Sequence, residues 1–198
     1  YSYTDNTAVG TATLTVNGKG NYTGAASVTF NIVNASITVD KDALGLLVYN
    51  ATYDGNAHNV IASGFESCAT AAGSDTLVWS FSLNGTSDWK NMLQLKDATV
   101  GTTVYYKVSG DNHSDATGSF TVVINKKKIT SVSGITAESR DYDGTTAATL
   151  DYSAAQFPDV CNSDDIKIVS ATGTFDGKNA GQRKVFVSDI VLGGDAAA

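Results

Sequence analysis

Proline, cysteine and long apolar runs are scarce in this 198-residue chain. Proline occurs once, at Pro158, and no stretch approaches the roughly 20 apolar residues that cross a bilayer. The two cysteines, Cys68 and Cys161, lie far apart, and neither belongs to a C-x-x-C or Cys/His group of the kind that binds zinc. We therefore expect no membrane span and no such metal centre, and two unpaired thiols in preference to a disulfide.

Positive charge is also scarce. The chain has 13 lysines and arginines against 20 aspartates and glutamates, which gives a net charge of −7 and a pI near 4.6. Binding to nucleic acid needs clustered basic side chains that neutralise phosphates, and the only basic run is Lys126-Lys127-Lys128. This pattern argues against nucleic acid as a partner and predicts that the side chains of the run are solvated, at a strand or in a linker.

Catalytic motifs are missing as well. The sequence has no G-x-S-x-G, P-loop, H-E-x-x-H or dinucleotide-binding glycine pattern, so we expect neither an enzyme nor a cofactor. Three pairs of neighbouring carboxylates occur, at Asp40/Asp42, Asp141/Asp143 and Asp164/Asp165. Such pairs are mostly solvated, and a weakly held calcium ion is the only ligand that they suggest.

The chain does contain an internal repeat. Two short markers return about 90 residues later: Val9-Gly10-Thr11 as Val100-Gly101-Thr102, and Tyr53-Asp54-Gly55 as Tyr142-Asp143-Gly144. A shorter echo of the first marker begins at Ala180. Because two independent markers share one period, the sequence indicates an array of similar small modules.

Composition and alternation predict that each module is built from strands. Gly, Ser, Thr and Asn are abundant, whereas strong helix formers are few. Alternating apolar and polar residues predict strands at 11–16, 26–32, 37–39, 46–48, 59–61, 77–83, 104–108, 119–124, 129–132, 147–150, 166–171, 184–187 and 190–192. Six or seven short strands in about 90 residues are typical of an immunoglobulin-like sandwich. The expected fold class is all-β, with tandem immunoglobulin-like β-sandwich modules; a β-grasp-like variant of the module is the alternative.

The two tryptophans differ in their surroundings. Trp79, Phe81 and Leu83 share one face of a predicted strand, and a large aromatic ring in a central strand of a small sandwich usually lies in the core. Trp89 follows a polar turn and is the better candidate for an exposed ring. A ring that stacks on a sugar needs amides or carboxylates beside it. The candidates for these contacts are Asn84, Asp88, Asp111 and Asn112.

The repeated Tyr-Asp-Gly markers have a structural explanation. An Asp side chain accepts a hydrogen bond from the backbone two residues on, and Gly tolerates a positive φ. We therefore expect Asp54-Gly55 and Asp143-Gly144 to form tight turns, with the rings of Tyr53 and Tyr142 packed at the end of the core. A catalytic aspartate would have no reason to recur from module to module.

These elements together resemble a known family. The Tyr-Asp-Gly turns, the tryptophans around 82–85, the strand at 100–110 and the turn at 18–24 are similar to the YDG and MBG tandem repeats of large bacterial surface proteins described as adhesins. The resemblance implies three parts: residues 1–34 as the C-terminal strand pair of a preceding repeat, 35–126 as a complete β-sandwich repeat, and 127–198 as a YDG-type repeat without its last strand.

The resemblance also implies a function. The family forms extracellular stalks or adhesive arrays on the bacterial cell surface or wall, so we expect a non-catalytic stalk repeat whose partners are the neighbouring repeats. The alternative is a module that binds a host glycan or protein through Trp89 and nearby turn residues, and a third hypothesis is an accessory domain of a hydrolase. Because the last repeat lacks a strand, we also expect strand 26–32 to add to its open edge, in a neighbouring molecule if the geometry of the array keeps the two ends of one chain apart.

Overall fold

The computed structural model describes residues 1–73, 75–161 and 164–195. These residues form strands and turns with one short α-helix, α1 (Lys41–Leu47), and one 3-10 helix, η1 (Phe65–Cys68), so the expected all-β class is confirmed. In the described part of the chain, no helix has the length and apolar character needed to cross a membrane. The chain divides into two compact units, Tyr1–Ala51 with Ala57–Ile124, and Thr52–Asn56 with Asn125–Ala198.

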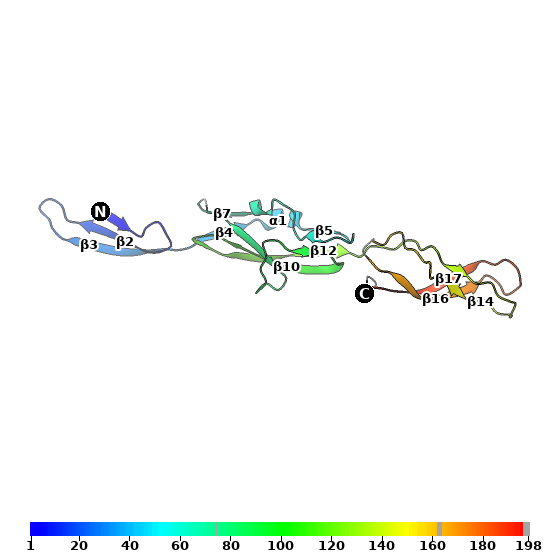
Figure 1. Cartoon of the computed structure of the whole chain (residues 1–198). Helices are drawn as coiled ribbons and strands as arrows, with labels where there is room; N and C mark the ends of the chain where they lie inside the picture. The colour runs from blue at the N-terminus through cyan, green and yellow to red at the C-terminus, as the bar shows by residue number, and fades with distance from the viewer. Residues whose placement is uncertain (74, 162–163, 196–198) are drawn as a thin grey trace. The chain divides into compact units, whose positions relative to one another are not determined.

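The first unit begins with a small antiparallel sheet, in the order β1 (Ser2–Thr4), β2 (Gly10–Asn17) and β3 (Ala25–Ile32) (Figure 1). The hairpin predicted at 11–16 and 26–32 is confirmed, with Ala12 opposite Phe30. Gly18 N donates to Gly24 O at 2.8 Å and closes its loop. Ala12 is fully buried, but β3 is exposed over most of its length, and Phe30 keeps 42% of its surface exposed.

A four-stranded sheet forms the centre of the first unit, in the order β5 (Asn50–Thr52), β12 (Ala116–Asn125), β10 (Thr99–Ser109) and β8 (Val78–Ser82). The long strand β10 runs antiparallel to both β12 and β8, and Val104 lies opposite Phe120. Tyr106 lies opposite Phe81 on one side and Gly118 on the other. A Cβ atom at Gly118 would collide with the Tyr106 ring, so the missing side chain at Gly118 makes room for Tyr106.

A second layer covers one face of this sheet. It contains the sheet β11 (His113–Ser114), β4 (Ala35–Val39) and β7 (Ala69–Ala71), together with α1 and η1. Figure 1 shows β4, β7 and α1 on one side of β10 and β12. A separate two-stranded sheet pairs β6 (His58–Asn59) with β9 (Gln94–Leu95). The arrangement is a two-layer, sandwich-like module, as the strand pattern predicted.

Helix α1 corrects the strand predicted at 46–48. The Asp40 side chain caps the helix, because its Oδ1 accepts hydrogen bonds from the N–H groups of Asp42 at 3.1 Å and Ala43 at 3.0 Å. Leu44 then turns into the core, where it is buried. Only Val48 keeps β character, as an isolated bridge to Ile61.

Aromatic rings from both layers meet in the core. Trp79 and Phe81 are buried as predicted, with Trp79 only 5% exposed. Val104 and Tyr106 are buried as well, while Phe120 is half-buried. The side chain of Leu83 does not join them and is 50% exposed, because β8 ends at Ser82 and the chain turns there.

The second unit contains two smaller sheets. One pairs β13 (Thr136–Ala137) with β15 (Leu150–Asp151), and the other has the order β14 (Ala147–Ala148), β16 (Lys167–Phe175) and β17 (Val185–Gly193). The strands predicted at 184–187 and 190–192 are one continuous strand, β17, which is antiparallel to β16 with register shifts between Ile168 and Thr172. The segment 129–132 is not a strand, which corrects that prediction.

Candidate functional site

The turn that precedes Trp89 is held together by its own side chains. The Asn84 carbonyl oxygen Oδ1 accepts hydrogen bonds from the N–H groups of Thr86 at 2.9 Å and Ser87 at 2.8 Å. The Asn84 amide Nδ2 donates to Ser87 Oγ at 2.8 Å and to Asp88 Oδ2 at 3.4 Å. The buried hydroxyl of Ser82 donates to the carbonyl of Ser87 at 2.6 Å. Asn84 and Asp88, two of the residues expected to contact a ligand, are therefore already used to hold the turn.

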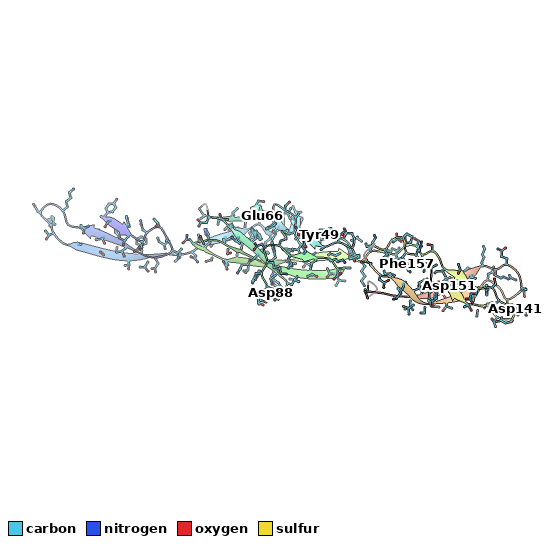
Figure 2. All side chains as sticks on the ribbon, viewed as in Figure 1. Tyr49, Glu66, Asp88, Asp141, Asp151 and Phe157 are labelled. Atoms are coloured by element: carbon cyan, nitrogen blue, oxygen red, sulfur yellow. The ribbon has the colours of Figure 1, made fainter. Side chains whose placement is uncertain are left out.

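Trp89 itself is half-buried beside the β8–β10 pair. The ammonium group of Lys107 lies 5.3 Å from the centre of its ring, a cation–π distance. Directly after it, Lys90 pairs through its backbone with Phe81, which ties this segment to β8. A side chain of the same unit, Lys107, therefore already lies over the Trp89 ring. Figure 2 shows Asp88, the residue before Trp89, on the side of the unit opposite Glu66.

Asp111 and Asn112 lie in a different turn. In the antiparallel β8–β10 ladder, Ser82 faces Tyr105 at one end and Val78 faces Ser109 at the other. Asn84 and Asp88 follow the first end, and Asp111 and Asn112 follow the second. Since a strand advances about 3.4 Å per residue, the two ends are about 14 Å apart. The structure therefore brings Asn84, Asp88 and Trp89 together and places Asp111 and Asn112 elsewhere.

The second turn serves to fix His113. Asn112 adopts a positive φ of 59°, and its carbonyl accepts a hydrogen bond from Ala35 N at 3.0 Å. The buried His113 ring contacts the carbonyl of Asp111 at 2.6 Å through Nδ1 and the carbonyl of Ala72 at 3.0 Å through Nε2. These contacts join β11 to neighbouring loops, which is a structural task.

The two Tyr-Asp-Gly turns share one local geometry. Asp54 Oδ1 accepts from the backbone N–H of Asn56 at 2.9 Å, and Asp143 Oδ1 accepts from that of Thr145 at 2.8 Å. The glycines that follow, Gly55 and Gly144, have positive φ angles of 84° and 77°. Each turn is thus closed by the aspartate and permitted by the glycine.

The surroundings of the two turns differ. The Tyr53 hydroxyl donates to Asp164 Oδ1 at 2.8 Å, and the Tyr53 backbone N–H donates to the carbonyl of Asn125 at 2.9 Å. All of these residues belong to the second unit. Sequence reasoning singled out Asp164 only as one of a carboxylate pair, and no local pattern could have linked it to a tyrosine 111 positions away.

At the other turn, a guanidinium group takes part. Arg140 forms an ion pair with Asp143 and donates to the carbonyl of Thr145 at 2.7 Å. The Arg140 guanidinium, and after it the Thr145 donors, hold the pKa of Asp143 well below its usual range. An open pocket of about 330 Å³ adjoins this turn. Its lining includes both arginines of the chain, Arg140 and Arg183, together with Tyr142 and Phe175.

The carboxylate pairs that suggested calcium have other roles. Asp40 caps α1, Asp143 pairs with Arg140, and Asp164 accepts from Tyr53. Among the described residues, no group of three His, Cys, Asp or Glu side chains could hold a metal ion. Both Cys68 and Cys161 are free thiols.

Comparison with known proteins identifies one part of the chain. Residues 125–198 match the family model of the YDG domain, so the resemblance of this segment to a YDG-type repeat is confirmed. The match begins where the long second segment of the second unit begins, at Asn125. No curated protein and no solved structure matches the chain.

Proposed function

We propose that this chain is a non-catalytic structural segment of a tandem-repeat stalk on a bacterial cell surface, in an adhesin-like protein. Its partners are neighbouring repeats of the same protein, and it lies outside the cell. The YDG domain at 125–198 supports this proposal, because the resemblance noted in the sequence associates such repeats with bacterial surface proteins. The adhesive or ligand-binding function would then belong to another part of the full protein.

The observation that carries the proposal is repetition of structure as well as sequence. The β2–β3 and β10–β12 hairpins both place a fully buried small or branched residue opposite a phenylalanine, Ala12 opposite Phe30 and Val104 opposite Phe120. The two Tyr-Asp-Gly turns repeat one hydrogen-bonding pattern. Recurring scaffold features with different side chains around them are typical of a repeat array, in which each module supports its neighbours.

The physical properties of the chain suit a stalk. Antiparallel ladders satisfy the backbone groups of long strands such as β10 and β12, and a net charge of −7 favours solubility and repulsion between arrays. The alternative, glycan binding through Trp89, is less well supported. The amide of Asn84 is used within its own turn, Lys107 lies over the Trp89 ring, and Asp111 and Asn112 lie in another turn.

The proposal can be tested by replacement in bacteria that carry the full-length protein. The segment is deleted in one strain and replaced in another by an unrelated rigid β-repeat of equal length. A spacer is interchangeable, so we expect adhesion to fall on deletion and to recover on replacement. Antibody against residues 125–198 should label intact cells. If adhesion does not recover although the replacement protein reaches the cell surface, the binding module is favoured. If the antibody does not label intact cells, the stalk proposal is refuted.

A further inference from the structure

The turn at Thr52–Asn56 belongs to the second unit, although the residues on both sides of it belong to the first. Within the second unit, two hydrogen bonds hold it. One joins the Tyr53 hydroxyl to Asp164 Oδ1 at 2.8 Å, and the other joins the Tyr53 N–H to the carbonyl of Asn125 at 2.9 Å. Tyr53 thus bonds to two residues of the segment that matches the YDG domain.

The acceptor Asp164 belongs to a loop that has hydrogen bonds of its own. Asp159 accepts hydrogen bonds from the N–H of Thr130 at 2.8 Å and from its hydroxyl at 2.7 Å, which fastens the start of the YDG domain to this loop. The N–H of Asp164 donates to the carbonyl of Cys161 at 2.9 Å. None of these three bonds involves Tyr53, so part of the ordering of the loop does not depend on the tyrosine.

The second Tyr-Asp-Gly turn has the same geometry but a different environment. Tyr142 keeps 66% of its surface exposed, so the expectation that its ring packs at the end of the core is wrong. Figure 2 shows Asp141, its neighbour, at one end of the second unit and Phe157 at the other. Phe157 begins the loop that leads to Asp164, since its carbonyl accepts from Val160 N at 3.1 Å. Asp164 comes just before the start of β16 at Lys167, whereas Phe175 N at the end of β16 donates to the carbonyl of Thr146, beside the second turn, at 2.8 Å. The unit therefore presents an acceptor carboxylate near one end of β16 and an exposed Tyr-Asp-Gly turn near the other.

We propose that the Tyr-Asp-Gly turn is a latch between successive repeats, and that Tyr142 binds a following YDG-type repeat as Tyr53 binds Asp164. This inference rests on the proposed tandem array. The partner is defined chemically as a repeat with a carboxylate in the position of Asp164 and a free backbone carbonyl in the position of Asn125. Because donor and acceptor lie at opposite ends of one unit, the contact is head-to-tail and extends a chain of repeats in one direction.

The latch at Tyr53 can be tested in the whole chain by hydrogen exchange. The variants are Tyr53→Phe, Asp164→Asn and their combination, with Tyr142→Phe as the matched control at a turn of identical geometry. Losing the bond should speed amide exchange at residues 52–56 and 125–130 by about 3- to 10-fold in each single variant. The double variant should be no faster than the singles, and Tyr142→Phe should leave both segments unchanged.

Three results would refute the latch between Tyr53 and Asp164. They are exchange equal to the parent in Tyr53→Phe, additive effects in the double variant, and the same acceleration in Tyr142→Phe. Each would mean that the hydroxyl does not act through Asp164. Hydrogen exchange in the purified protein does not depend on where the protein lies in the cell. Failure of the latch can therefore be distinguished from failure of the stalk proposal, which is tested by surface labelling.

The docking of Tyr142 is tested by lengthening the chain. A second copy of residues 111–195, joined after Asp195, supplies a following repeat. We expect exchange at residues 141–145 to slow by about 3- to 10-fold, and Tyr142→Phe in the longer chain to remove the protection. Unchanged exchange at 141–145, with the added repeat itself protected, would refute the docking. If the amides of the added repeat exchange without protection, that repeat has not folded, and the Tyr53 variants of the original chain then test whether the turn acts as a latch.

Discussion

Phe65 lies edge-on to Trp79, with 5.5 Å between the ring centres and 84° between the ring planes. Phe65 belongs to η1 in one layer of the first unit and Trp79 to β8 in the other, and Phe65 contacts Phe81 in the same way at 5.4 Å. Perpendicular ring contacts stabilise beyond the area that they bury. This cluster therefore joins the two layers.

Replacing Trp79 by alanine should destabilise the first unit by about 3–5 kcal/mol, because it leaves a cavity at the centre of the cluster. The loss is measured from urea unfolding followed by tyrosine fluorescence or circular dichroism. The buried Trp79 Nε1 has no hydrogen-bond partner in the described residues, so truncation removes one unsatisfied donor and the true value should lie toward the lower end. A loss below about 1 kcal/mol would contradict the core assignment.

Replacing Trp89 by alanine is the matched control. The half-buried ring loses its contact with Lys107, which is worth about 0.5–1 kcal/mol at an exposed site. We expect a much smaller change in the free energy of unfolding than for Trp79→Ala. On a glycan array, the parent and Trp89→Ala proteins should give the same absence of signal. Reproducible glycan binding by the parent that disappears in Trp89→Ala would instead favour the binding module.

Acid should destabilise the second unit. The Arg140 ion pair lowers the pKa of Asp143, and the hydrogen bond from the Thr130 N–H lowers that of Asp159. Since both folded-state pKa values lie below the unfolded value of about 3.9, their stabilisation is present above that pH and is lost as the pH falls further. Urea unfolding between pH 6 and pH 2, about the range that matters here, should show this decline. Asp159→Asn should make the free energy of unfolding depend less steeply on pH. An unaltered pH dependence would argue against the hydrogen bond from Thr130 to Asp159.

The two thiols should differ in reactivity. Burial, and then the nearby carboxylates Asp40 and Glu66, raise the pKa of Cys68, which lies in the core. Cys161 is only partly buried and has the Lys127 ammonium 3.7 Å from its sulfur. Because the thiolate is the reactive form, iodoacetamide should modify Cys161 first and Cys68 only on unfolding. Mass spectrometry of the two peptides checks this order, and equal rates in the folded protein would contradict the buried position of Cys68.

The outer edge of β17 should promote self-association. In the described residues β17 pairs with β16 alone, and it exposes apolar side chains such as Phe186, at 62%, and Val191. Unpaired, apolar edges recruit other strands, so we expect concentration-dependent association in light scattering. Val191→Lys should reduce it, and removal of residues 1–34 should do so too if strand 26–32 is the segment recruited. A monomer at high concentration would rule out association through this edge.

The alternating segments were the part of the fold that sequence could predict. The strand at 78–82 and the hairpin of β2 and β3 follow from period-2 patterns with clear turn residues. Residues 46–48 were misjudged, because a short apolar run does not reveal its period. The stronger signal for a helix was Asp40, a favourable N-cap residue that is followed by residues compatible with a helix. In the structure Asp40 caps the helix four residues before the buried Leu44.

The candidate site was less accessible to sequence reasoning. The shared geometry of the Tyr-Asp-Gly turns follows from local residue chemistry, so the sequence was sufficient to predict it. The separation of Asp111 from Asn84 depends on the antiparallel register of β8 and β10. The bond between Tyr53 and Asp164 depends on a contact between distant parts of the chain. Neither of these relationships leaves a trace in the neighbouring residues.

If the chain belongs to a repeat array, as we propose, the pairing of Tyr106 with Gly118 has a consequence for how that array evolves. In the β2–β3 hairpin, the pair two residues beyond Ala12–Phe30 is Leu14 and Val28. In the β10–β12 hairpin, the pair two residues beyond Val104–Phe120 is Tyr106 and Gly118, so one large and one absent side chain replace two of similar size. A genetic exchange between repeats whose breakpoint fell between the two strands could place a branched side chain opposite Tyr106, where even a Cβ atom collides. Recombinants that inherit both strands from one parent repeat avoid this clash, which should make the hairpin a unit of inheritance.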